Sequence, residues 1–450
     1  MNDSAKEPVI ENPLRRVLGN FGLLLRGRGI GAVLLLGATA LMAKALGPAE
    51  FGIIVLMQTY TLLIRGLLNF KQSHAIIRFG VPAWDAGDIK TLRRLIHVGR
   101  RIDLYAALAA TLAAVLLAPL IGPMMGLDSE RVTMLAMFSL TLLTSGNVSA
   151  TGILRLFDQF DTLGRKEIID PLIRFTGIAI AWWLEAPFVV FLAIFALAYC
   201  AENIYVICCG RREYERQLGE AVEGDDFREA KIAEFSGLRD FLWITYWQSN
   251  IDLVPKHLSI LMAGALLGAT EAGLLRLARQ FSTVLAKPAV LIRQVVFLDL
   301  TRSWNQGSSD FKLIAYRTAL VSGGIGLIFV LIGFFFGEYL LGEIIGEEFI
   351  GAAPVLTLLL LAASFDLFAS SLRSAAYAVG RAGKVLRLSV VSSIVYLTSF
   401  VLLTQELGIV GAGIAACAAA LIAPLVLARD IHKSTQANPA PATHEAQEIK

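Results

Sequence analysis

Many basic side chains lie inside strongly hydrophobic stretches, where a charge is costly, and for five of them contact with the lipid headgroups is the weaker explanation. They are Arg65, Lys256, Arg276, Arg279 and Lys287. A charged residue within a membrane span costs several kcal/mol and usually faces the interior of a helix bundle or a watery cavity. Arg276 and Arg279 are three residues apart and share a helical face, which Lys287 approaches again about two turns later. A cavity lined by such cations favours an anionic ligand, and the paired planar donors of guanidinium groups suit phosphate.

Arg28, near the start of the first hydrophobic stretch, is the sixth residue of this predicted cationic cavity. Basic residues near the cytoplasmic ends of spans can instead extend to the lipid headgroups, and this reading stays open for Arg26, Arg155, Arg293 and Arg373. Asp252 and His257 are candidates for coupling to a proton or sodium ion. Histidine titrates near neutral pH, although a packed, neutral histidine is the alternative.

The composition of the chain indicates that these charges lie within a membrane protein. Its 450 residues are 56% hydrophobic and 17% charged, whereas about 25% of a soluble domain is charged. A helix of about 20 apolar residues crosses the hydrocarbon layer. We therefore predict an all-α integral membrane protein with twelve transmembrane helices, near residues 25–46, 52–72, 103–126, 132–156, 167–184, 187–209, 241–264, 271–298, 315–337, 353–378, 386–405 and 409–428.

The distribution of Lys and Arg predicts the orientation of these spans. Basic residues collect in alternate loops, and such loops stay in the cytoplasm. The other loops are neutral or acidic apart from Lys44 and Arg131. Both termini are therefore predicted to be cytoplasmic. We expect a cytoplasmic N-terminal segment at 1–22 and a first six-helix bundle at 23–210. A cytoplasmic linker at 211–240 leads to a second six-helix bundle at 241–430, which is followed by a disordered cytoplasmic tail at 431–450.

Two cytoplasmic segments have the pattern of surface helices. In residues 88–96, Leu92, Leu95 and Ile96 share a face beside a basic one, which suits a membrane surface with anionic headgroups. A second segment, at 225–238, begins with Asp225, which can cap a helix. An ordinary connecting helix is the alternative for both segments.

A six-residue motif occurs twice in the sequence, about half a chain apart. Gly47 to Gly52 and Gly268 to Gly273 both read Gly-x-x-Glu-x-Gly, at an offset of 221 residues. Internal repeats are typical of transporters, which place substrate sites between them. The offset pairs Gln58 with Arg279 and brings Arg65 beside the position of Lys287, so equivalent helices carry cations. Glycine at these corners permits a tight turn.

The run from Ala45 to Gly52 resembles the corner between the first two helices of polysaccharide-unit flippases. These are oligosaccharide transporters of the multidrug/oligosaccharidyl-lipid/polysaccharide (MOP) exporter superfamily. The second copy, followed by the residues from Leu274 to Phe281, is similar to the matching corner of their second half. Asp252 lies about two turns earlier than the aspartate often found in the seventh helix of this family. Residues 297–300 also lack the proline expected at the end of the eighth helix.

The resemblance implies a MATE-like fold, with two bundles arranged as a V around a cationic cavity. It implies transport of undecaprenyl-diphosphate-linked glycans across the bacterial inner membrane by alternating access, for lipopolysaccharide or exopolysaccharide assembly. The implied partners are that lipid-linked glycan, membrane lipids and the polysaccharide polymerase or chain-length machinery. No cofactor, metal or nucleic acid is expected.

Three other classes of protein remain as alternatives. A multidrug exporter of the same superfamily would share the fold, but it generally uses acidic residues in the N-terminal bundle, and the first span has none in its apolar run. A lipid II flippase usually carries two further helices. A membrane enzyme of polysaccharide assembly would need a sizeable external loop or cleft. The sequence lacks a phosphate-binding P-loop, which argues against ATP hydrolysis within the chain.

Overall fold

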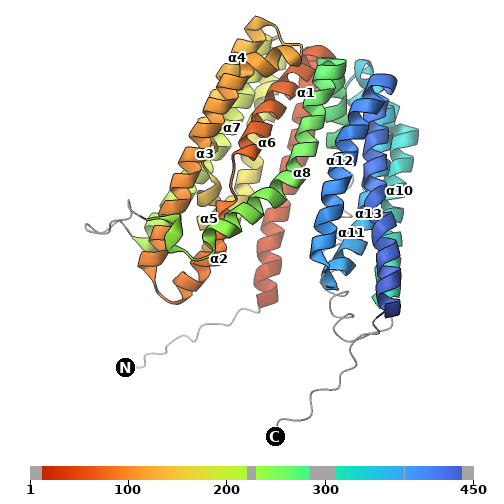
Figure 1. Cartoon of the computed structure of the whole chain (residues 1–450). Coiled ribbons are helices and arrows are strands. Elements are labelled where there is room, and N and C mark those ends of the chain that lie inside the picture. Colours follow the sequence, from red (N-terminus) through yellow and green to blue (C-terminus); the bar gives the residue numbers. More distant parts are fainter. Residues whose placement is uncertain (1–12, 220–229, 284–310, 380, 438–450) are drawn as a thin grey trace, which may run out of the picture. The chain divides into compact units, whose positions relative to one another are not determined.

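The structure is a computed structural model that describes residues 13–219, 230–283, 311–379 and 381–437 (Figure 1). Within these ranges the regular secondary structure is entirely helical. Of the predicted disordered tail at 431–450, residues 431–437 are helical as part of the last helix, and the remainder lies outside these ranges. The labelled elements are α1 (Pro13–Leu67), α2 (Gln72–Asp85), α3 (Ile89–Met124), α4 (Ser129–Ser139), η1 (Leu140–Ser145), α5 (Val148–Leu156), α6 (Phe160–Trp183), α7 (Phe188–Leu218), η3 (Ile232–Glu234), α8 (Leu238–Leu267), α10 (Phe311–Ile344), η4 (Glu347–Ala352), α11 (Ala353–Ala378), α12 (Ala382–Leu407) and α13 (Ile409–Ala437).

Many of these helices are long and apolar enough to cross a bilayer. Within the described ranges, eight helical runs meet that requirement, and one of them, Arg26–Asp85, contains the first two predicted spans. The predicted fifth and seventh spans form α6 and α8, which carry more charge. The expectation of an all-α, multi-pass membrane protein is therefore confirmed. The total of twelve spans stays a prediction.

The chain divides into two compact units. The first contains residues 1–41, 67–116 and 136–247, and the second contains residues 42–66, 117–135 and 248–450. Each unit has its own buried core of aliphatic side chains. The predicted domain boundaries, with a linker at 211–240, remain a prediction.

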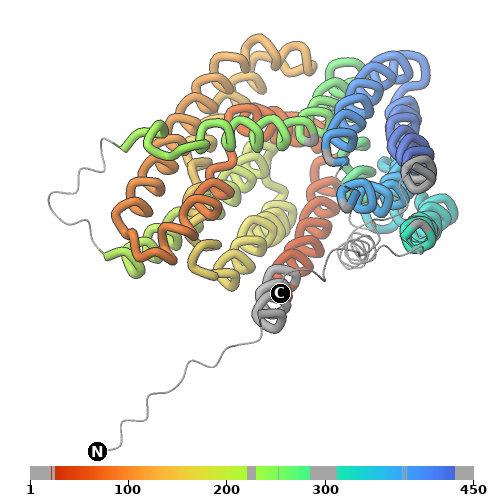
Figure 2. The backbone as a smooth tube through the Cα atoms, turned by 60° about the horizontal axis from the view of Figure 1, so that its bottom comes forward, coloured from red at the N-terminus to blue at the C-terminus, as the bar shows by residue number. Residues whose placement is uncertain are grey.

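Four helices of the second unit pack side by side. α11 contacts α10, α12 and α13, and the same group stays together in the turned view of Figure 2. Alanines at positions of closest approach allow this packing, because small side chains let helix backbones come together in a membrane. Ala315, Ala319, Ala369 and Ala375 are all fully buried there.

The repeated glycines form turns, as predicted. Gly47 interrupts α1 with a φ of 70°, and Pro48 opens the following helical segment. At the equivalent position, Gly268 has a φ of 99° between α8 and a helix at 269–283. Both values lie in the left-handed region, where glycine is favoured over residues with a Cβ.

The last glycines of the two repeats also contact each other. A Cβ on Gly273 would lie 3.0 Å from the Gly52 Cα, and a Cβ on Gly52 would lie 1.9 Å from the Ala269 carbonyl oxygen. The two copies therefore meet backbone to backbone within the second unit. The sequence suggested turns at these corners but gave no sign of this contact.

We predict that Gly52→Ala prevents stable folding, because the added methyl group would overlap the Ala269 carbonyl. The measurement is the yield of monodisperse protein after detergent extraction. Gly324→Ala is the matched control, since a Cβ on Gly324 meets nothing within 4 Å. Replacing a helical glycine with alanine without a clash stabilises a helix by about 1 kcal/mol. Equal yields of the two variants would contradict the close contact.

The segment at residues 88–96 is not a lipid-facing surface helix. Leu92, Leu95 and Ile96 are buried in the protein, because the start of α3 packs against α2 and the segment that precedes α8. Of the basic residues, Arg93 donates to the Leu218 carbonyl and Arg94 pairs with Glu234 at 2.7 Å. Residues 89–96 instead form the first turns of α3, which continues into the third predicted span. For the second segment, residues 225–229 lie outside the description and the remainder holds the short helix η3.

The contact between Arg94 and Glu234 should be sensitive to acid. The Lys231 N–H and then Arg94 lower the pKa of Glu234, because both favour its charged form. A lowered pKa gives stabilisation that is present above the ordinary glutamate pKa and is lost as the pH falls through the folded value. We predict faster hydrogen exchange at residues 232–235 in Glu234→Gln at neutral pH. The wild type should approach this behaviour only in acid, and identical exchange in both proteins at neutral pH would contradict the pairing.

Candidate functional site

Arg279 forms the centre of a basic cluster in the second unit. It lies on the helix at 269–283, and its guanidinium donates to the Lys256 carbonyl at 2.5 Å, to the Ser259 hydroxyl at 3.1 Å and to the Tyr396 hydroxyl at 2.7 Å. All three acceptors are neutral oxygens from α8 and α12. These bonds fix the plane of the guanidinium without cancelling its charge.

Three other predicted residues belong to this cluster. The imidazole of His257 lies within electrostatic range of Arg276, Arg279 and Lys256. The Lys256 side chain is exposed, whereas Arg276 and Arg279 are half-buried. The structure therefore brings together Lys256, His257, Arg276 and Arg279, which we call the basic cluster. The sequence predicted three of them as anion ligands and His257 as a coupling residue.

Close helix packing positions the cluster. Residues 48–67 of α1 run along α8, because a Cβ on Gly264 would meet Leu56 at 2.5 Å and one on Gly66 would meet Leu253 at 2.6 Å. Arg65 precedes Gly66, and Leu253 lies one turn before Lys256. This places Arg65 near the α8 segment that leads into the basic cluster. Lys287 and the side chain of Asp252 lie outside the described residues.

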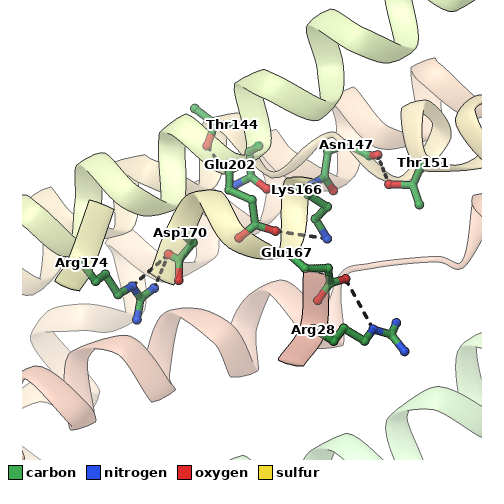
Figure 3. A network of polar contacts seen from close by, with 10 residues as sticks. Arg28, Thr144, Asn147, Thr151, Lys166, Glu167, Asp170, Arg174 and Glu202 are labelled. Atoms are coloured by element: carbon green, nitrogen blue, oxygen red, sulfur yellow. Dashed lines mark hydrogen bonds and ion pairs between the residues drawn. The ribbon is translucent and has the colours of Figure 1, made fainter. Parts of the chain in front are cut away.

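Arg28 occupies a different setting, in the first unit. α1 packs tightly on α6, where a Cβ on Gly27 would overlap the Gly164 carbonyl and one on Gly31 would overlap that of Glu167. This contact sets Arg28 beside Glu167, with 3.9 Å between Nε and Oε1 (Figure 3). The Arg28 side chain is still 60% exposed. It therefore has a carboxylate neighbour, unlike the uncompensated cation that the sequence suggested.

Nearby cations of the first unit also have acidic partners. Arg174 binds Asp170 at 2.7 Å, where both are buried, and Lys166 binds Glu202 at 3.1 Å (Figure 3). The Arg174 guanidinium also lies 4.2 Å from the centre of the Phe195 ring. Sequence reasoning missed the role of Asp170, although its spacing of four residues from Arg174 was a usable signal.

Cations in this protein are thus held in two ways. Arg174 and Lys166 of the first unit bind carboxylates, and so does Arg373 of the second. The observed partners of Arg279 are instead a carbonyl and two hydroxyl groups. An anion close to the basic cluster would gain charge-assisted hydrogen bonds, which are about twice as strong as neutral ones. The charge and donor arrangement of the cluster favours an anionic group such as a phosphate or a carboxylate.

Comparison with known proteins identifies the family. The family model for "Polysaccharide biosynthesis protein" matches residues 17–297, which is more than half of the chain. The chain belongs to this family. It is also similar to the inner membrane protein YghQ of Escherichia coli strain K12, at 24% identity over 343 residues, which cover 76% of this chain and 96% of YghQ.

Solved structures show the fold of this polysaccharide biosynthesis protein. The lipid II flippase MurJ, in an inward closed conformation, matches with a TM-score of 0.74 and 12% identity, over 91% of this chain and 87% of MurJ. An inward-facing multidrug resistance MATE family transporter of the MOP superfamily matches with a TM-score of 0.70 and 14% identity, over 92% of this chain and 99% of that transporter. The MATE/MurJ-like fold expected from the resemblance is confirmed.

We predict that Tyr396→Phe lowers the free energy of unfolding of this protein by about 1.5–3 kcal/mol, which is the typical contribution of a hydrogen bond to a charged group. The cause is loss of the acceptor for Arg279 Nη2. Thermal unfolding of the purified protein in detergent measures the effect. Tyr377→Phe is the matched control, because Tyr377 is exposed on α11. A Tyr396→Phe protein as stable as the control would contradict the role given to this bond.

Proposed function

We propose that this protein moves undecaprenyl-diphosphate-linked oligosaccharide units across the bacterial inner membrane for polysaccharide or lipopolysaccharide assembly. The observation that carries the proposal is the basic cluster, where cations on α8 and the helix at 269–283 converge and Arg279 is held by neutral oxygens. Membership of the polysaccharide biosynthesis family supports a glycan-linked substrate. The likeness to a lipid II flippase and the inner-membrane relative YghQ support the proposed membrane and the type of process.

In the proposed mechanism, the diphosphate provides the negative charge that the cluster binds. Arg276 and Arg279 offer planar paired donors to its oxygens, while Lys256 and Lys287 add positive charge, with Arg65 as a further ligand. The lipid tail stays in the bilayer. The protein exposes the site first to the cytoplasm and then to the periplasm, as transporters with internal repeats do. Twelve spans in two six-helix bundles, with both termini in the cytoplasm, complete this proposal.

The assignment of residues can be tested in cells that depend on this protein. We expect Arg276→Ala with Arg279→Ala to abolish surface glycan assembly, because both guanidinium donors to the diphosphate are removed. Arg373→Ala is the matched control in the same unit, since Arg373 pairs with Asp366 at 3.0 Å outside the basic cluster. Normal surface glycan in the double variant, at wild-type protein levels, would exclude the basic cluster as the binding site.

The substrate class can be tested with purified protein in liposomes. We expect translocation of a fluorescent undecaprenyl-diphosphate-linked oligosaccharide and no uptake of cationic dyes, because a cation-lined site repels positive charge. Accessibility of the fluorophore to an external quencher measures the movement. Dye transport without glycan movement would instead assign the protein to the drug exporters, whose fold it shares.

A further inference from the structure

His257 is the imidazole of the basic cluster, and it lies on the turn of α8 that holds Arg279. The Arg279 guanidinium donates to the Lys256 carbonyl at 2.5 Å and to the Ser259 hydroxyl at 3.1 Å. His257 lies between these two acceptor residues in the sequence of α8. The imidazole is half-buried, so it is neither freely solvated nor sealed from a ligand. A titratable ring therefore lies beside a guanidinium that the fold holds in place.

The surroundings of this imidazole are positively charged. The charged groups within electrostatic range are Lys256 on the same helix and Arg276 and Arg279 on the helix at 269–283. From α12, Tyr396 approaches the cluster through its bond to Arg279 Nη2, and a phenol is neutral at neutral pH. The side chain of Asp252 lies outside the described residues. Within the described part of the chain, the charges that face the imidazole are therefore basic.

The imidazole has little reason to carry a charge of its own before an anion binds. In proteins, a hydrogen bond to one ring nitrogen of histidine fixes its tautomer and protonation. Within the described residues, the buried Nδ1 of His257 has no hydrogen-bond partner. Like charges nearby also disfavour a further positive charge. We therefore expect a neutral imidazole at neutral pH in the absence of an anion.

A bound diphosphate would reverse this balance. When it is linked to a lipid on one side and a sugar on the other, each phosphorus carries one ionised oxygen, and no group of the diphosphate titrates near neutral pH. Negative charge beside the imidazole favours its protonated form and offsets the repulsion from the cations. The protonated ring has a donor on each nitrogen, and a charged donor makes a strong hydrogen bond to a phosphate oxygen. Binding of the anion and binding of the proton thus strengthen each other, because coupling between two ligands is reciprocal.

We propose that His257 takes up a proton from the solvent when the diphosphate binds, and that the imidazolium then becomes a further ligand of the diphosphate. This inference rests on the proposed function, because it requires the diphosphate to occupy the basic cluster. It makes the proton the coupled ion and places it in the substrate site. The affinity for the diphosphate should accordingly fall as the pH rises, because the neutral imidazole contributes no charge.

The test is isothermal titration calorimetry of the purified full-length protein with an undecaprenyl-diphosphate-linked oligosaccharide in detergent. Titrations at neutral pH in two buffers of different ionisation enthalpy give the number of protons taken up per ligand. We expect the wild type to approach one proton and His257→Gln to take up none. The Kd of the wild type should rise by up to about tenfold per pH unit, and that of His257→Gln should change much less.

A second variant keeps the test decisive if His257→Gln does not fold. His257→Lys supplies a fixed positive charge, so it should bind the ligand tightly across the same pH range without taking up a proton. His97→Gln is the matched control, because His97 is a half-buried histidine of the first unit, and it should take up as many protons as the wild type. Asp252→Asn should do the same.

The possible failures can be told apart. If the wild type binds the ligand without taking up a proton, or if the uptake persists in His257→Gln, the proposal is overturned while diphosphate binding stands. Loss of the uptake in Asp252→Asn but not in His257→Gln would assign the proton to the carboxylate and equally overturn it. A wild type that does not bind the diphosphate-linked oligosaccharide would overturn the proposed function as well.

Discussion

The central constraint on this protein is the cost of charge inside an apolar helix bundle. In the first unit the cost is offset by carboxylates, as Asp170 does for Arg174 and Glu202 does for Lys166. In the second unit Arg279 is held by a backbone carbonyl and two hydroxyl groups. Neutral oxygens satisfy the hydrogen-bonding capacity of a guanidinium but leave its charge in place. The basic cluster therefore keeps an attraction for anions.

Helix approach at glycine determines where these charges lie. Gly27 and Gly31 let α1 meet α6 closely enough to place Arg28 beside Glu167. The contact of Gly52 with Gly273 joins the two repeats at their corners, next to the helices that carry Arg65 and Arg279. A side chain at any of these positions would push two helices apart and move the charged residues with them. The repeated glycines thus carry no chemistry themselves, but they fix the helix packing around the cluster.

Much of this arrangement could be predicted from local patterns in the sequence. Apolar runs located the long helices, the repeat located the turns at Gly47 and Gly268, and the spacing of Arg276 and Arg279 placed both on one helix. Contacts between distant segments could not be predicted in this way. Tyr396 lies 117 residues from Arg279, and no local pattern connects them.

The segment at 88–96 shows a second limit of sequence reasoning. A face of leucine and isoleucine beside a basic face suits a membrane surface and a protein core equally well. The structure buries the apolar face and directs Arg93 and Arg94 to the Leu218 carbonyl and to Glu234.

The most direct test of the central claim is the affinity of the purified protein for undecaprenyl diphosphate carrying a short glycan. The account predicts that Arg279→Ala raises the Kd at least about tenfold, because each charge-assisted hydrogen bond contributes about 1.5–3 kcal/mol. The uncharged lipid alcohol should bind weakly to both proteins. An unchanged Kd in a folded Arg279→Ala protein would contradict the claim that the basic cluster binds the diphosphate.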